Sequence, residues 1–213
     1  MKLVSVNIAK PEAVNINGQH VLTGINKKPQ SEPIWLGKLN LVGDGQADLT
    51  VHGGEFQAVY SYPVEHYAFW QKELNQASLP YGTFGENFTV SGLLETDVHV
   101  GDIFKVGNAL IQATMPRIPC FKFGNKVGKP DILEKFLFSG FSGFYHKVIE
   151  EGEVAAGDQI ELIDRDTNSI SIRKALGLYK LKEGDVMSLS HALTIQSLPP
   201  LLRENYESRL EKL

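Results

Sequence analysis

The stretch Met-Pro-Arg-Ile-Pro-Cys-Phe-Lys-Phe, residues 115–123, holds the residue best suited to do chemistry, Cys120, which is the only cysteine of the chain. Arg117 and Lys122 flank it and would stabilise a thiolate if their charges lie close to the sulfur. Pro119 restricts the backbone beside the thiol. A stiff, cation-flanked thiolate can serve as a nucleophile or as a soft metal ligand, whereas the simplest alternative is a small buried apolar residue.

Two glycine-bearing stretches are further candidates for a binding site. His52 ends a strand-like run and is followed at once by Gly53 and Gly54, which allow the backbone to approach a bound group. Asn87 follows Gly85 in the second stretch, where its amide could donate to an anion. Each pattern is also ordinary turn chemistry, so neither defines a site by itself.

Several familiar motifs are absent. Residues 124–130, GNKVGKP, are too short for a phosphate loop and end in proline where serine or threonine is required. Residues 43–48, GDGQAD, start like a dinucleotide fingerprint but have Asp48 in place of its third glycine. The chain has neither CxxC nor HExxH, and one cysteine cannot hold an iron–sulfur cluster of its own.

Bulk properties narrow the class of protein. The net charge of -4 over 213 residues argues against a nucleic-acid partner, which usually requires a basic excess. No apolar run approaches the roughly 20 residues that span a bilayer, and the N-terminal residues alternate like a strand and do not form a signal-peptide core. A single cysteine excludes an internal disulfide framework. We therefore expect a soluble, cytoplasmic protein without a membrane or nucleic-acid partner.

The pattern of elements predicts a strand-rich part followed by a helical tail. Asn17-Gly18 between apolar flanks predicts a hairpin, and Gly107-Asn108 joins two further strands. Helical insertions are predicted after Pro63 and over residues 130–138. From about Ser171 the spacing is helical, and this tail of about 45 residues is too short for a strong core of its own. It is expected to pack on the strand-rich part or on a second copy, as a homodimer.

Taken in order, these stretches resemble the MOSC family, named after the C-terminal domain of molybdenum cofactor sulfurase. The matching pieces are TGINKKP, GDGQADLTVHGG, YPVEHYAFW, FGENF and VGDIFKVGNALIQATMPRIPCFK. The chain is most similar to the bacterial subfamily that detoxifies 6-N-hydroxylaminopurine. The resemblance implies a mainly β fold with α, a MOSC β-barrel at residues 1–165 with helical insertions. Residues 166–213 would form a small C-terminal helical bundle of the three-helix type.

The resemblance also implies a molybdenum–pterin cofactor and reduction of N-hydroxylated compounds, most simply 6-N-hydroxylaminopurine to adenine. Cys120 would be the molybdenum ligand, and His52 would act beside it as a catalytic proton donor. Arg117 could grip the cofactor's phosphate with two parallel hydrogen bonds. The full set of expected cofactor-binding residues is Lys27, His52, Asn87, Arg117 and Lys122.

The chain offers no evident means to collect the two electrons that such a reduction consumes. We therefore expect a separate electron-donor protein, either a flavin or an iron–sulfur reductase. Two other classes remain open at this point. One is a carrier of molybdenum cofactor or sulfur without reductase activity, and the other is a metal-free hydrolase or transferase that uses Cys120 with His52 as base.

Overall fold

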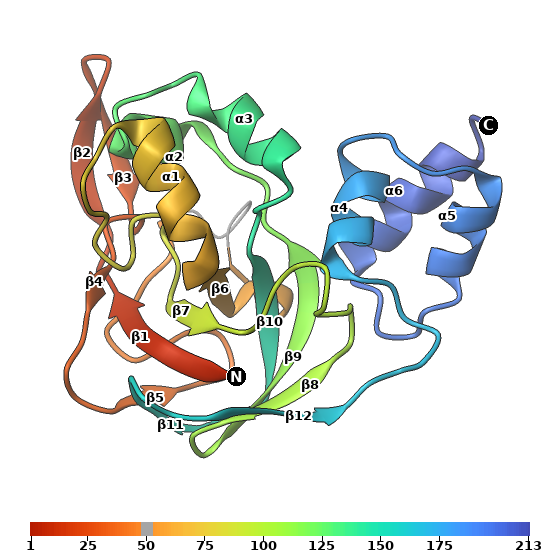
Figure 1. Cartoon of the computed structure of the whole chain (residues 1–213), viewed down its shortest axis with the longest axis horizontal. Helices are drawn as coiled ribbons and strands as arrows, with labels where there is room; N and C mark the ends of the chain where they lie inside the picture. Colours follow the sequence, from red (N-terminus) through yellow and green to blue (C-terminus); the bar gives the residue numbers. More distant parts are fainter. Residues whose placement is uncertain (48–52) are drawn as a thin grey trace.

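The protein, described here from a computed structural model that covers residues 1–47 and 53–213, has a mixed α/β fold (Figure 1). In the described part of the chain the main sheet has eight strands in the order β12-β8-β9-β10-β6-β7-β1-β4. All neighbours are antiparallel except β6 and β7. The strands are β1 (Lys2–Ile8), β4 (Lys28–Pro29), β6 (Val59–Pro63), β7 (Phe88–Ser91), β8 (Ile103–Val106), β9 (Ala109–Pro116), β10 (Phe144–Glu150) and β12 (Ile160–Asp164).

The main sheet curves so that its two ends approach each other. Backbone hydrogen bonds join β1 to the residues just before β12, from Leu3 N to Asp158 O at 2.9 Å and from Gly157 N to Leu3 O at 2.7 Å. Apolar residues such as Leu3, Phe104 and Phe144 fill the enclosed side and are almost fully buried. This curvature agrees with the expected strand-rich fold.

Two small ribbons complete the β structure of the described residues. The predicted hairpin is confirmed as β2 (Glu12–Ile16) and β3 (Gln19–Thr23). Its turn needs two residues with positive φ, and Asn17 and Gly18 adopt φ of 52° and 84°. The other ribbon pairs β5 (Ile34–Leu36) with β11 (Gly152–Val154).

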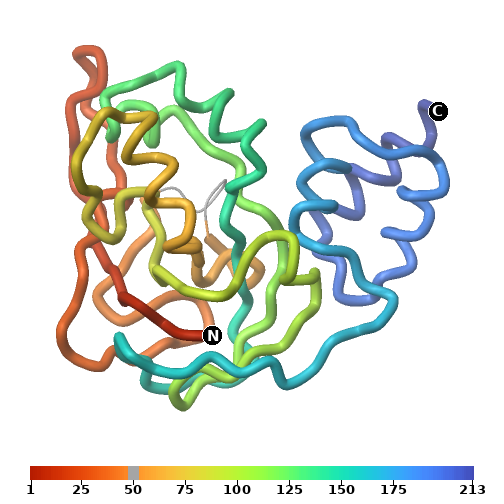
Figure 2. Tube along the Cα trace, in the orientation of Figure 1, coloured from red at the N-terminus to blue at the C-terminus, as the bar shows by residue number. Residues whose placement is uncertain are grey.

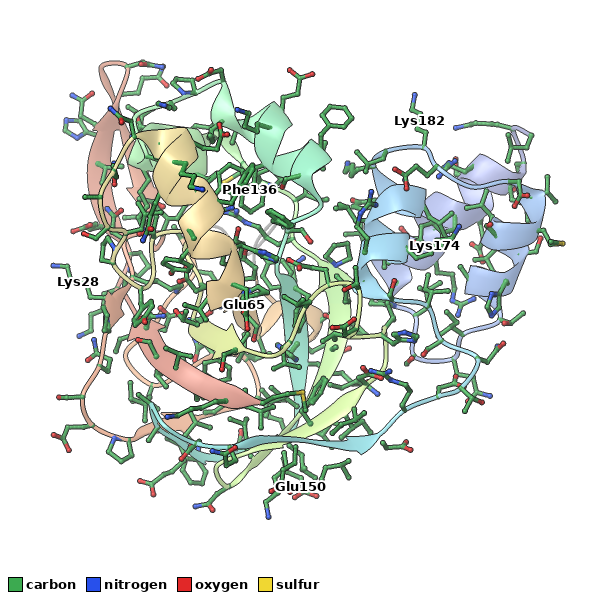
Figure 3. The ribbon with its side chains drawn as sticks, in the orientation of Figure 1. Lys28, Glu65, Phe136, Glu150, Lys174 and Lys182 are labelled. Carbon is green, nitrogen blue, oxygen red and sulfur yellow. The ribbon has the colours of Figure 1, made fainter. Side chains whose placement is uncertain are left out.

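Short helices enclose an aromatic cluster beside the sheet. They are the 3-10 turn η2 (Val64–His66), with α1 (Tyr67–Leu74), α2 (Phe121–Lys126) and α3 (Ile132–Ser139). A further 3-10 turn, η1 (Glu55–Gln57), packs through Phe56 on the main core. Phe136 points inward from α3 (Figure 3) and stacks on Trp70 of α1 with ring centroids 5.4 Å apart. Trp70 Nε1 donates to the hydroxyl of Tyr62 at 2.6 Å, so its polar edge is satisfied in the interior.

The sequence predicted some of these helices correctly and missed another. The helix expected after Pro63 starts later, because Pro63 ends β6 and η2 precedes α1. The insertion at residues 130–138 corresponds to α3. Helix α2 was not expected, since its six residues Phe-Lys-Phe-Gly-Asn-Lys show no clear helical periodicity.

The C-terminal tail is helical as predicted and consists of α4 (Ile172–Tyr179), α5 (Val186–Leu193) and α6 (Pro200–Leu210). These helices stand together to one side of α1–α3, and the C-terminus lies at their outer end (Figure 2). Ser171 caps α4 by accepting from Lys174 N at 3.2 Å. Ile172 N donates to Val98 O at 2.8 Å, which ties α4 to the loop before β8.

The tail shares one continuous apolar core with the sheet. Leu178 of α4, Leu189 of α5 and Leu202 of α6 belong to the same buried cluster as Phe104 and Ile111 of the sheet. The division at residues 165 and 166 therefore remains a prediction. Among the described residues no helix is long and apolar enough to cross a membrane.

We predict that Leu178→Ala lowers the free energy of unfolding by about 2–5 kcal/mol, because it empties a fully buried site. Since the core is shared, unfolding in urea should stay a single transition when followed by circular dichroism and by tryptophan fluorescence. Met187→Ala is the matched control, because Met187 is 79 % exposed and should change stability by under about 0.5 kcal/mol. Two separated transitions would instead show that the tail is an independent domain.

Candidate functional site

A single cavity gathers most of the side chains that the sequence singled out. Among the described residues, its wall includes Lys27, Asn87, Arg117, Cys120 and Lys122. His52 lies outside the described residues, but Gly53, which follows it, lines the same cavity. The other five predicted residues are thus brought together from widely separated parts of the chain, while their individual roles remain predictions.

Cys120 is positioned by the end of a strand and the start of a helix. Strand β9 ends at Pro116, Arg117 N donates to Gly143 O at 3.3 Å, and the chain then enters α2. Cys120 is the residue that precedes α2, and its carbonyl accepts from Phe123 N at 2.9 Å. Cys120 is therefore half-buried at the junction of β9 and α2, on the wall of the cavity.

Arg117 is buried with a hydrogen-bonding atom left unused. Its guanidinium carbon lies 5.3 Å from the ring centroid of Tyr60, 5.2 Å from Phe123 and 5.3 Å from Phe136. Such contacts with aromatic faces stabilise a cation that has lost water. Nη1 has no partner among the described residues, although the whole residue is only 5 % exposed. Buried donors are normally satisfied, so this atom indicates a ligand with acceptor oxygens.

The charge of Lys27 is neutralised inside the protein. Lys27 Nζ donates to Asp44 at 2.5 and 2.7 Å, with the two side chains only 8 % and 1 % exposed. Burial lowers the pKa of Lys27, and the carboxylate of Asp44 opposes that shift. Asp44 also accepts from Ala9 N at 2.9 Å. Asp44 was not singled out in the sequence, where it reads as part of a glycine-rich turn.

Asn87 links strands around the same carboxylate. Its Nδ2 donates to Asp44 at 2.8 Å and to Asn7 O at 3.3 Å, and its Oδ1 accepts from Tyr60 N at 3.2 Å. These bonds connect β1, β6 and the loop that carries Asp44. Asn87 thus holds the wall of the cavity in shape, and an additional role in orienting a ligand remains a prediction.

Two lysines of α2 donate to main-chain carbonyls and pair with no carboxylate in the described part of the protein. Lys122 Nζ donates to Leu22 O at 3.0 Å. Lys126 Nζ, which the sequence did not single out, donates to Ile25 O at 2.7 Å and to Gly82 O at 2.6 Å. Burial lowers the pKa of Lys126 to about 8, against the opposing effect of Glu86.

The cavity therefore favours an anionic ligand. Of the described residues in its wall, Lys27, Arg117 and Lys122 are cationic and Asp44 is the carboxylate that neutralises one of them. This excess stands against a net charge of -4 for the whole chain. No group of three histidine, cysteine, aspartate or glutamate side chains that could hold a metal is found among the residues that the structure describes.

The fold and the site define a class of protein with a curved mixed sheet and one cysteine thiol in the wall of a cavity that cationic side chains line. Comparison with known sequences identifies the family, because residues 48–161 match the MOSC domain. The chain belongs to the MOSC domain family.

The relatives cover the chain to different extents. Uncharacterized protein YflK of Bacillus subtilis (strain 168) is 36% identical over 99% of this chain and 95% of its own length. A protein of Gibberella moniliformis (strain M3125 / FGSC 7600) named "Reductase" is 30% identical over 70% of this chain, which corresponds to 27% of that protein. The crystal structure of YiiM from Geobacillus stearothermophilus has a TM-score of 0.82 and 32% identity, and covers 98% of both chains.

We predict a pH dependence of stability that comes from Lys126. Its pKa is about 8 in the folded protein and near the ordinary value of about 10.4 in the unfolded chain. Between these pH values the unfolded chain binds more protons, so the contribution of Lys126 to the free energy of unfolding rises with pH, by up to about 3 kcal/mol. Below pH 8 this contribution is lost.

The measurement is urea unfolding of the wild type and of Lys126→Met at pH 7, 8.5 and 10. Relative to the variant, the wild type should gain stability as the pH rises. A difference between the two proteins that stays constant over this range would contradict the lowered pKa.

Proposed function

We propose that this protein is a molybdenum-cofactor-dependent reductase of N-hydroxylated compounds, with conversion of 6-N-hydroxylaminopurine to adenine as its reaction. The observation that carries the proposal is that the wall of one cavity contains both Cys120 and Arg117, and that the buried Nη1 of Arg117 has no partner among the described residues. Membership of the MOSC domain family supports a molybdenum cofactor, and a relative named as a reductase supports redox chemistry. We also propose that the protein works in the cytoplasm.

The residues present fit such a cofactor. A thiolate is a soft donor of the kind that transition metals accept. The Cys120 thiol would provide one ligand from the protein to the metal. Arg117 offers a buried fork to a phosphate oxygen, and the aromatic rings around it keep the fork in a fixed orientation. When bound, the molybdenum supplies oxygen-atom transfer by cycling between states two electrons apart.

The protein's own residues bind and orient. Arg117 and Lys122 would hold the phosphate, and Cys120 would hold the metal end of the cofactor. The pair of Lys27 with Asp44, joined to Asn87, holds another part of the cavity wall in shape. His52 remains our proposed proton donor for the release of water, and its position lies outside the described residues.

The electrons would come from a second protein. With one cysteine, the chain cannot hold an iron–sulfur cluster of its own, and its glycine pattern at residues 43–48 does not match a dinucleotide fingerprint. We propose a flavin or iron–sulfur reductase that docks transiently. Contacts of this kind are small, under about 1,200 Å² in total, and need no large apolar surface. Association of the chain as a homodimer remains a proposal as well.

We predict that Cys120→Ser abolishes turnover and loses most of the bound molybdenum, because a neutral hydroxyl is a poor replacement for a thiolate. Protein made in a host that synthesises the cofactor would be assayed for molybdenum and pterin content. Reduction of 6-N-hydroxylaminopurine would be measured with a chemical reductant, with NADH alone, and with NADH plus a reductase.

The expected pattern is turnover with the reductant or the reductase and none with NADH alone. Full activity of Cys120→Ser would refute the role as metal ligand. Molybdenum binding without any turnover would favour a cofactor carrier, and activity in molybdenum-free protein would favour a cysteine hydrolase.

We further predict that the protein without cofactor binds inorganic phosphate or sulfate, and that Arg117→Ala weakens this binding by at least about tenfold, because it removes a charge-assisted contact. Arg117→Lys keeps the charge without the fork and should be intermediate. Arg203→Ala is the control, since Arg203 donates to Leu193 O at 2.9 Å in the C-terminal helices. Isothermal titration calorimetry would measure the affinities. Equal affinity in the wild type and in Arg117→Ala would contradict the role of Arg117 in binding phosphate.

A further inference from the structure

Lys126 connects the helix that follows Cys120 to two loops that come from distant parts of the chain. Its ammonium group donates to Ile25 O, in the loop that follows β3, and to Gly82 O, in the loop that precedes β7. Ile25 and Gly85 of these loops line the cavity. One side chain at the end of α2 thus holds both loops at fixed positions relative to the helix.

The loop around Gly82 is itself held by a buried carboxylate. Glu86 is fully buried and accepts from Gly82 N at 2.7 Å and from Phe84 N at 3.0 Å, as well as from the hydroxyl of Tyr67. Gly82 is therefore fixed from two sides, because its N–H donates to Glu86 and its carbonyl accepts from Lys126. A backbone so constrained gives Lys126 a rigid point of attachment.

Helix α2 needs such an attachment because it is short. It runs only from Phe121 to Lys126, and an isolated helix of this length is not stable in water. Phe123 packs its middle into the aromatic cluster, where its ring also faces Arg117. Lys126 fixes its last residue, and Cys120 stands immediately before its first.

The charges around Lys126 argue against a role in packing alone. Glu86 attracts its ammonium group, whereas Lys27 and Arg117 repel it, and burial removes water from it. An apolar residue would fill the same space without these costs. What an apolar residue cannot do is donate to two carbonyls at once.

We propose that Lys126 is a positioning residue for Cys120: by bonding the carbonyls of Ile25 and Gly82 it locks α2 against the cavity loops and so holds the thiol beside Arg117. The importance of this positioning rests on the proposed role of Cys120 as the ligand of the metal. The test below uses the protein without cofactor, so it can fail or succeed independently of any reductase activity.

The experiment compares Lys126→Met and Lys126→Arg with the wild type. Lys129→Met is the matched control, because Lys129 also donates to a carbonyl, that of Glu73 at 2.7 Å in α1, and neither residue lines the cavity. Hydrogen exchange followed by mass spectrometry reports the opening of α2 and of the two loops. Alkylation by iodoacetamide over a range of pH reports the thiol, and because Cys120 is the only cysteine, every event occurs there.

In Lys126→Met we expect exchange at residues 121–126 to accelerate by at least about tenfold. The pH midpoint of alkylation should move upward by at least about 0.5 unit, a threefold change in the acid dissociation constant of the thiol. The reason is that the thiolate is no longer held beside the guanidinium of Arg117. Lys126→Arg, which keeps charge and donors, and Lys129→Met should both resemble the wild type. If Lys126→Met fails to fold, Lys126→Gln, which keeps an amide donor, replaces it with an intermediate effect expected.

Unchanged exchange in α2 would overturn the proposal, because the helix would then be held by other contacts. Faster exchange with an unchanged midpoint would also overturn it, since the tether would then have no effect on the thiol. A shifted midpoint without faster exchange would show that the charge of Lys126 acts through space, and this too would contradict a positioning role.

Discussion

The guanidinium of Arg117 is buried without a carboxylate partner among the described residues, and the structure around it compensates for the water that this cation has lost. A charge taken out of water is costly unless other groups replace the lost hydration. Here the faces of Tyr60, Phe123 and Phe136 do so, and they come from β6, α2 and α3. The helical insertions are therefore more than a cover for the sheet, because two of them supply rings that make this cation tolerable.

The distribution of carboxylates explains which cations remain available to a ligand. Asp44 neutralises Lys27, and Glu86 is already engaged by a hydroxyl and backbone N–H groups of its own loop. Neither carboxylate reaches Arg117 or Lys122 with an ion pair in the described part of the chain. The site thus contains two kinds of cation. Lys27 is neutralised by Asp44 and maintains the wall, whereas Arg117 and Lys122 have no carboxylate partner there and remain available to a ligand. In the sequence all three look alike as basic residues.

Local features of the structure could be predicted from the sequence, and pairings between distant residues could not. The turn at Asn17 and Gly18 follows from the need for positive φ, and the grouping of Arg117 with Cys120 follows from their spacing. Lys27 and Asp44 are 17 positions apart, and Lys126 and Ile25 are 101 apart. These contacts depend on how the sheet brings its loops together, which no local pattern specifies. Helix α2 was not predicted for the same reason. Its six residues show no clear helical periodicity, and contacts with distant residues such as Ile25 hold it in place.

The segment that carries Cys120 leaves the sheet and returns to it at nearly the same place. β9 and β10 are paired neighbours, and Arg117 N bonds Gly143 O where the excursion begins and ends. The two ends are held together by the sheet whatever lies between them, so lengthening the excursion costs little additional closure entropy. Insertions between the residues that form the site can therefore lengthen the segment at residues 118–142 without changing the register of the strands. Connecting segments of this kind tolerate insertions better than the strands that they join.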